Sequence, residues 1–149
     1  MPFVIASPNV HVYYMVPSCL DRSNTIDPTK PTVVLLHPRF FDSHFFAKQY
    51  GDARLARGYN LVTLDHHYHG QTQAKLDDKP YNFILVSKSS DALVISIVPF
   101  LFQVANDMLR AMSEIGIANA HIFAASLGSQ IAIVMQTLAP GAHGLCFLN

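Results

Sequence analysis

The chain has 149 residues, half of them hydrophobic and 13% charged, and its formal net charge at pH 7 is zero. This length fits a single domain with a hydrophobic core, and the balanced charge argues against nucleic acid or an anionic membrane surface as a partner. Cys19 and Cys146 form neither a disulfide framework nor a zinc pattern, so we expect a reducing, cytoplasmic location. Residues 1–16 hold two prolines and no Lys or Arg, unlike a signal peptide.

The first half of the chain predicts a hairpin followed by a strand–helix–strand unit. Residues 2–6 and 10–16 are predicted strands, joined by the turn residues Ser7-Pro8-Asn9. Two continuous apolar runs follow at 32–36 and 60–65, as expected of strands buried on both faces. A helix is predicted between these runs, from Asp42 or Ser43 to Arg57 and ended by Gly58. This spacing predicts parallel pairing with a right-handed crossover.

The second half predicts two helices and two strands. Residues 106–115 place Met108, Leu109 and Met112 on one helical face before Gly116. A short strand begins at Ala120, and a helix follows from Leu127 to about Leu138, before Pro140-Gly141. The last apolar run, 144–149, is predicted as one more parallel strand. The sequence contains no internal repeat, so we expect a single domain over residues 1–149.

A tight strand-to-helix turn has Ser126 at its apex, in the segment Ala124-Ala125-Ser126-Leu127-Gly128. Small residues surround the serine, as a crowded turn requires. The pattern is a variant of the nucleophile elbow G-x-S-x-G, with Ala124 in place of the first glycine. An ordinary helix N-cap serine is the alternative interpretation, since serine is favoured at that position.

Three motifs, taken in order, resemble the N-terminal half of an α/β-hydrolase-fold protein. Leu35-Leu36-His37-Pro38-Arg39 resembles the His-Gly motif that follows the third strand, with Pro38 in place of glycine. Residues 65–72 resemble the D-x-R-G-x-G-x-[ST] turn, with His67 and Tyr68 replacing its arginine and first glycine. The elbow is the third motif. The implied fold is α/β: a mostly parallel sheet with flanking helices and an N-terminal β-hairpin, truncated after about the sixth strand.

The resemblance implies acyl hydrolysis, with Ser126 as nucleophile and a small-molecule ester or related compound as substrate. It also implies that the backbone N–H groups of Leu127 and Arg39 form the oxyanion hole. A serine at this position disfavours the epoxide hydrolase and haloalkane dehalogenase branches, which use aspartate. Neither a cofactor nor a metal is implied.

The remainder of a catalytic triad is missing from the chain as given. In this fold the order is Ser, then Asp or Glu, then His. Between Leu127 and Asn149 there is no Asp or Glu, and the only histidine is His143. We therefore expect the chain to be inactive alone. The alternative function is a non-catalytic remnant that acts as a binding or interaction fragment; the substrate and the oligomeric state stay open.

Residues 86–103 are atypical for the resembled family. Two interpretations fit: a translated intron, with Val-Ser encoding a splice donor and Pro-Phe-Leu-Phe-Gln a pyrimidine tract, or a lid-like insertion that packs on the sheet. The apolar run 92–102 is too short to span a membrane and contains Pro99.

A histidine cluster, His66, His67 and His69, lies beside Asp65 and has the chemistry of metal ligands. Neighbouring residues of a turn point in divergent directions, and no further ligand set follows at metal spacing. We therefore expect no metal site here, and interpret His37 and His121 as loop and strand-end residues.

Overall fold

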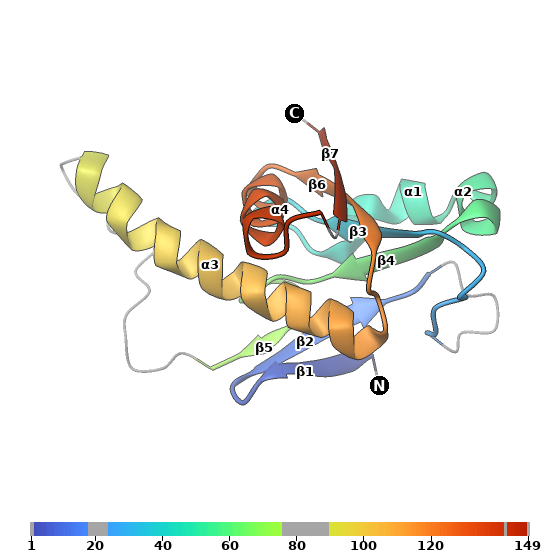
Figure 1. The fold of residues 1–149 in the computed structure, drawn as a ribbon, viewed down its shortest axis with the longest axis horizontal. Coiled ribbons are helices and arrows are strands. Elements are labelled where there is room, and N and C mark those ends of the chain that lie inside the picture. The colour runs from blue at the N-terminus through green and yellow to red at the C-terminus, as the bar shows by residue number, and fades with distance from the viewer. Residues whose placement is uncertain (1, 18–23, 76–89, 142, 149) are drawn as a thin grey trace.

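The computed structural model describes residues 2–17, 24–75, 90–141 and 143–148. A seven-stranded sheet forms its centre, with strand order β1-β2-β4-β3-β6-β7 and the short β5 paired to β2 (Figure 1). The strands are β1 (Phe3–Ser7), β2 (Val10–Met15), β3 (Thr32–Leu36), β4 (Asn60–Leu64), β5 (Gln73–Ala74), β6 (Ala120–Ala125) and β7 (His143–Leu148). The helices are η1 (Ser43–Phe46), α1 (Ala47–Tyr50), α2 (Ala53–Gly58), α3 (Ser90–Ile115) and α4 (Leu127–Leu138).

The sheet is mixed, as the sequence predicts. β1 and β2 form the expected antiparallel hairpin, and β2 also runs antiparallel to β4. β4, β3, β6 and β7 are mutually parallel, with Leu36 in register with Leu64 on one side and with Ala124 on the other. The carboxyl ends of β3, β4 and β6 therefore meet at one edge of the sheet.

The helix predicted from 42 or 43 to 57 is instead three short pieces, and aspartates cap the first and the last of them. Asp42 Oδ1 accepts from the His44 N–H at 2.9 Å, which starts the 3-10 helix η1. Asp52 Oδ1 accepts from the Arg54 N–H at 2.8 Å and starts α2. A side chain that caps a new N-terminus favours ending the preceding helix there. The predicted end at Gly58 is confirmed.

The helix predicted at 106–115 is longer than expected, because α3 begins at Ser90. Residues 90–103 of the atypical segment therefore belong to the same helix as 104–115, while residues 86–89 lie outside the described residues. Pro99 lies within α3, where it removes one backbone hydrogen bond. The N-terminal turns of α3 extend beyond the sheet (Figure 1).

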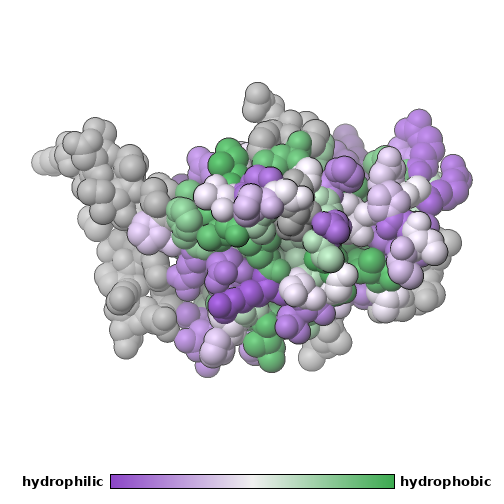
Figure 2. Space-filling model, in the orientation of Figure 1, coloured by the Kyte–Doolittle hydropathy of each residue, from purple (hydrophilic) through white to green (hydrophobic). Residues whose placement is uncertain are grey.

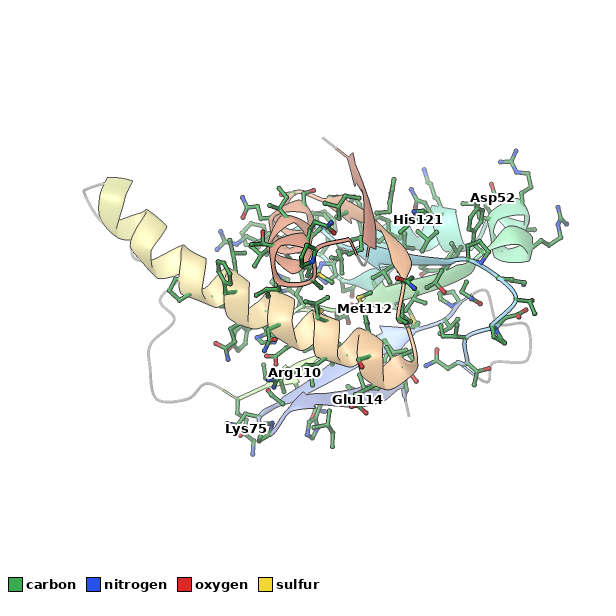
Figure 3. All side chains as sticks on the ribbon, viewed as in Figure 1. Asp52, Lys75, Arg110, Met112, Glu114 and His121 are labelled. Carbon is green, nitrogen blue, oxygen red and sulfur yellow. The ribbon has the colours of Figure 1, made fainter. Side chains whose placement is uncertain are left out.

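One face of the sheet is covered by α3 and α4, which pack against each other. Val34, Leu36, Ile122 and Ala124 are buried beneath these two helices in the hydrophobic core. Met112 lies on the buried side of α3, whereas Arg110 and Glu114 are exposed (Figure 3). The opposite face carries Val33, Leu35, Leu61 and Phe123, and these line a cavity shared with residues of α1 and α2.

Exposed hydrophobic side chains interrupt the polar surface of α4, where Ile133 is 54% and Leu138 is 43% exposed (Figure 2). Within the described parts of the chain, none of the helices combines the length and apolar character needed to cross a membrane.

Candidate active site

The candidate site lies where the carboxyl ends of the parallel strands meet, which is where open α/β sheets bind ligands. Three chain segments leave the sheet at this edge: the loop after β3, the turn after β4, and the turn from β6 into α4. The three sequence motifs occupy these segments, so the fold brings together residues as far apart in the sequence as Leu36 and Gly128.

Ser126 has a strained backbone. Its φ of 50° and ψ of −115° lie outside the left-handed helical region that L residues occasionally adopt. Ser126 occupies the N-cap position of α4, yet its side chain makes no capping hydrogen bond, and the residue is exposed. The geometry is that of a sharp strand-to-helix turn in which the serine hydroxyl does not cap the helix. The N-cap interpretation of this serine therefore lacks its defining hydrogen bond.

Gly128 allows α4 to start directly against the loop after β3. A Cβ placed on Gly128 would lie 2.3 Å from the Leu36 carbonyl oxygen and 2.9 Å from that of His37. Real Cβ atoms do not approach backbone oxygens so closely, so only glycine permits this contact. The contact brings the Leu127 N–H and the loop that holds Arg39 to the same edge of the sheet.

The loop after β3 is held by the imidazole of His37, which is fully buried. Its Nδ1 donates to the Pro38 carbonyl at 2.9 Å. The Arg39 guanidinium lies over the Phe40 ring, 4.8 Å from its centroid, and Phe40 adopts a positive φ of 69°. The loop thus turns sharply at Phe40 and presents that ring to solvent, with 83% of it exposed.

His37 stacks on His66, which follows β4. The two ring centroids are 3.8 Å apart and the ring planes differ by 22°. Burial lowers the pKa of both imidazoles, and that of His66 falls well below its ordinary value. Both rings are therefore neutral at pH 7. The contact between these two residues was not predicted from the sequence. Both directly follow the adjacent parallel strands β3 and β4, and this shared position is the signal that could have paired them.

Asp65 organises the turn after β4. Its Oδ1 accepts from the Ser43 N–H at 2.8 Å and from the Ser43 hydroxyl, and its Oδ2 accepts from the Gln71 N–H at 2.9 Å. Gly70 has a positive φ of 52°, and a Cβ there would overlap the Asp65 carboxylate. Tyr68 stands where the resembled motif has glycine, and it too has a positive φ, 62°. These contacts hold the turn together in spite of its two replacements.

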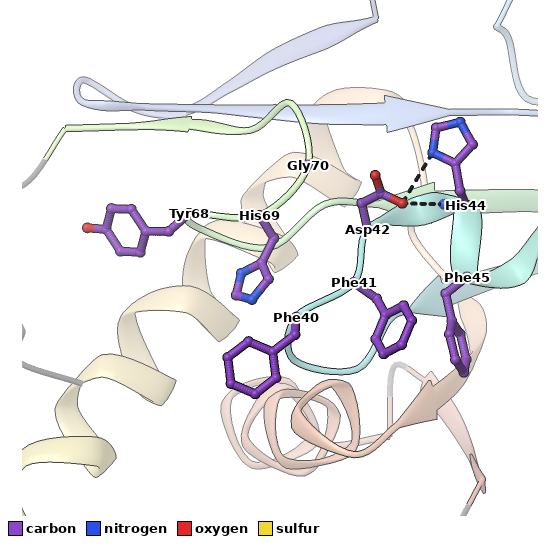
Figure 4. Close-up of a pocket in the computed structure, with 8 residues that line it drawn as sticks. All are labelled: Phe40, Phe41, Asp42, His44, Phe45, Tyr68, His69 and Gly70. Carbon is purple, nitrogen blue, oxygen red and sulfur yellow. Dashed lines mark hydrogen bonds and ion pairs between the residues drawn. The ribbon is translucent and has the colours of Figure 1, made fainter. Parts of the chain in front are cut away.

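A cleft of about 770 Å³ opens between the loop after β3 and the turn after β4 (Figure 4). Its walls carry exposed aromatic rings together with one carboxylate and two imidazoles. The lining residues are Phe40, Phe41, Asp42, His44, Phe45, Tyr68, His69 and Gly70. Ser126, Leu127 and Arg39 are outside this lining, but Arg39 directly precedes Phe40. Sequence analysis did not single out these aromatic residues.

A general base for Ser126 is missing from the described residues: none of their histidines or carboxylates is hydrogen-bonded to the Ser126 hydroxyl. In the part of the chain that the structure covers, no group of three or more His, Cys, Asp or Glu side chains could hold a metal ion. His66 points to His37, whereas His67 points to Asp107 of α3, with His67 Nε2 and Asp107 Oδ2 3.2 Å apart.

Solved structures resemble this chain over nearly its whole length. A carboxylesterase structure from Nitrososphaera gargenis aligns with a TM-score of 0.70 at 17% identity, covering 98% of this chain and 44% of its own. The 2-hydroxy-6-oxo-6-phenylhexa-2,4-dienoate hydrolase of a Rhodococcus strain aligns with a TM-score of 0.69 at 18% identity, again covering 98% and 44%. An α/β-hydrolase enzyme from a deep-sea metagenome gives 0.66 at 14% identity, covering 96% and 42%. No family model and no curated protein sequence matches.

These alignments show that the chain has the α/β-hydrolase fold, as its motifs imply. The chain spans 42–44% of the length of the three structures and is therefore a partial version of that fold. Epoxide hydrolases are also among the similar structures, so the fold by itself does not select one chemistry.

Proposed function

We propose that this chain carries the nucleophile and the oxyanion hole of a serine hydrolase that cleaves small-molecule esters or related acyl compounds. The observation that carries the proposal is the strained, exposed Ser126 whose hydroxyl takes no part in capping α4. Backbone strain of this kind persists where the surrounding structure imposes it, and it concentrates at functional sites. A serine at the apex favours acyl transfer over the chemistry of the aspartate-dependent branches.

The proposed reaction has two steps. Ser126 Oγ bonds to the acyl carbon, the ester C–O bond breaks, and the alcohol leaves with the proton that the serine gives up. Water then adds to the acyl-serine, the acid is released, and the serine regains its proton. The N–H groups of Leu127 and Arg39 would stabilise the oxyanion in both steps, and each such donor is worth about 3–4 kcal/mol in the transition state.

Ser126 needs a base to react quickly at neutral pH. The described residues offer none within hydrogen-bond distance, so the proposal assigns the chain a nucleophile and its oxyanion donors and leaves the base to a residue outside that set. The aromatic cleft adjoins the loop of Arg39, and its rings would bind an apolar part of the substrate.

The second candidate is a binding fragment without catalysis. The absence of a base bonded to Ser126 within the described parts of the chain favours it, as does an aromatic cleft whose lining excludes Ser126. In this alternative the cleft binds an apolar ligand and the elbow is a remnant.

A fluorophosphonate probe distinguishes the two candidates. Ser126 Oγ would bond to phosphorus with loss of fluoride, and the serine proton would pass to solvent. We expect slow labelling of the 149-residue chain at Ser126, because none of the described residues acts as its base, with the site located by peptide mass spectrometry and the label lost in Ser126→Ala. Ser129→Ala, three residues further along the same helix, is the matched control and should label normally. A wild-type chain that unfolds cooperatively but never labels would support the binding fragment and overturn the hydrolase proposal.

A further inference from the structure

The stacked pair His37 and His66 is joined by two hydrogen bonds. The His66 backbone N–H donates to His37 Nε2 at 3.2 Å, and His66 Nε2 donates to the His37 carbonyl oxygen at 2.6 Å. Both side chains are at most 1% exposed. The two rings are thus locked against each other inside the molecule, directly beneath the loop that leads to Arg39.

These bonds determine where each ring carries its hydrogen. His37 Nε2 accepts, so its hydrogen is on Nδ1, and that Nδ1–H donates to the Pro38 carbonyl at 2.9 Å. His66 Nε2 donates, so in the neutral ring Nδ1 bears no hydrogen, and this buried atom has no hydrogen-bond partner. A hydrogen added at His66 Nδ1 would be buried without an acceptor. A hydrogen added at His37 Nε2 would face the His66 backbone N–H.

The same bonds hold two consecutive peptide planes. His66 holds the carbonyl of the His37–Pro38 peptide, and His37 holds the carbonyl of the Pro38–Arg39 peptide. The Pro38 ring restricts φ between these planes to about −65°. In a trans peptide the N–H points opposite to the C=O. The Arg39 N–H is therefore directed away from the His37 ring by a chain of contacts that starts at His66.

We propose that His66 is a positioning residue for the oxyanion hole: through the His37 carbonyl and the His37 ring it sets the direction in which the Arg39 N–H points. This inference rests on the proposed function, because it assigns His66 a task at the site where Arg39 would bind the oxyanion. His66 is not one of the residues that line the cleft, although its ring packs edge-on against the lining residue His69.

The bond from the His66 backbone N–H to His37 Nε2 requires a neutral His37 ring, because a protonated Nε2 cannot accept. The charged and titratable groups around His37 are Asp65, with Oδ1 3.9 Å from Nε2, then Asp42, His66 and His69; those around His66 are His37, His67 and His69. Burial is the largest influence on the pKa of each ring and lowers it, which outweighs the opposite effect of Asp65 on His37. Both hydrogen bonds to the loop are therefore intact at pH 7.

Two substitutions separate the hydrogen bond from the packing. His66→Phe keeps a flat ring for the stack but removes the Nε2–H donor. His66→Gln places an amide N–H close to the former Nε2 and restores a donor. His69→Phe is the control for Arg39 amide exchange only, since its ring lies 5.4 Å from that of His37 but its Nδ1 bonds the His67 carbonyl rather than the loop, and it is not used for labelling because His69 lines the cleft.

Three measurements on the 149-residue chain test the inference. The ¹⁵N spectrum of the imidazoles should show the hydrogen on Nδ1 of His37 and on Nε2 of His66. Amide hydrogen exchange at Arg39 should accelerate at least about tenfold in His66→Phe, recover in His66→Gln and stay unchanged in His69→Phe. The rate of fluorophosphonate labelling per folded molecule should fall by on the order of 100-fold in His66→Phe and recover in His66→Gln, because small displacements of catalytic groups have effects of that size.

The outcomes separate this inference from the proposed function. If the wild-type chain is not labelled, the proposed function fails. The ¹⁵N spectrum of the two rings and the amide exchange at Arg39 still test whether His66 positions the loop. Normal labelling of a folded His66→Phe, with unchanged Arg39 exchange, would overturn the inference and leave the proposed function standing. If His66→Phe does not fold, the wild-type ¹⁵N spectrum and His66→Gln decide, and the opposite tautomer in either ring overturns the inference.

Discussion

His67 Nε2 and Asp107 Oδ2 lie 3.2 Å apart, and both residues are at most 3% exposed. The pair joins the turn after β4 to α3, so it couples the candidate site to the helix that covers the sheet. In the resembled motif an arginine occupies the position of His67. Phe100 of α3 packs beside the same turn and stacks on Tyr68 with an interplanar angle of 18°.

The first prediction concerns this buried pair. His67→Phe should lower the free energy of unfolding by about 2 kcal/mol, because it removes the polar atom nearest to the buried Asp107 Oδ2. The double variant His67→Phe/Asp107→Leu should be more stable than His67→Phe alone, since no buried polar group is left behind. Urea unfolding of the four members of the cycle measures the coupling. Arg54→Met, which removes an exposed ion pair with Asp52, is the control and should change stability little. Additive effects of the two buried substitutions would show that the pair is not coupled.

The second prediction concerns the turn after β4. Gly70→Ala should destabilise the chain by about 2 kcal/mol or more, because it combines a positive φ with overlap on the Asp65 carboxylate. Gly58→Ala is the matched control: its Cβ would meet no atom within 4 Å, and it lies at the end of α2. We expect that control to be neutral or to stabilise by up to about 1 kcal/mol. Equal effects of the two substitutions in thermal unfolding would contradict the described turn.

The third prediction concerns the start of α4. Gly128→Ala must push the helix away from the Leu36 and His37 carbonyl oxygens. We expect a folded but less stable chain in which the start of α4 is displaced from the loop after β3. Fluorophosphonate labelling of Ser126 should then fall by on the order of 100-fold, a larger relative loss than the change in folded fraction. Labelling that simply tracks the folded fraction would show that the close approach serves packing alone.

The fourth prediction concerns acid stability. Burial lowers the pKa of His37 and His66 below the ordinary value of 6.5. The unfolded chain therefore binds more protons than the folded chain between 6.5 and the lowered values, and stability from these rings is lost as pH falls through that window. The stability difference between wild type and His66→Phe, from urea unfolding, should shrink from pH 7.5 to pH 5. A difference that stays constant or grows would show that His66 is not held neutral.

Local sequence patterns located every strand that the structure describes except β5. The continuous apolar runs at 32–36 and 60–65 became β3 and β4, and the hairpin turn at Ser7-Pro8-Asn9 was confirmed. The prediction of one continuous helix between β3 and β4 was wrong. Gly51, which ends α1, and Asp52, which caps α2, are the sequence signals that mark the break. The start of α3 was missed because residues 86–103 were interpreted as an insertion. β5 has only two residues and depends on pairing with β2, which no local pattern reveals.

The candidate site was only partly accessible from the sequence. Its three motifs locate the segments at the sheet edge, and Ser126 as nucleophile with Leu127 and Arg39 as oxyanion donors stays a prediction. The stack of His37 on His66 and the contact of His67 with Asp107 join residues 29 and 40 positions apart. Such contacts depend on strand register and on which face of a helix is buried. The partners are therefore set by tertiary packing rather than by any short pattern.

The backbone conformation of Ser126 favours glycine, yet the chain has serine at this position. Glycine adopts a φ of 50° with a ψ of −115° far more easily than serine does, so Ser126→Gly should stabilise the chain by about 1 kcal/mol. A sequence selected for foldability alone would drift towards glycine at this apex. Under the proposed function, Ser126 is therefore a position where stability favours glycine while the reaction requires the serine hydroxyl.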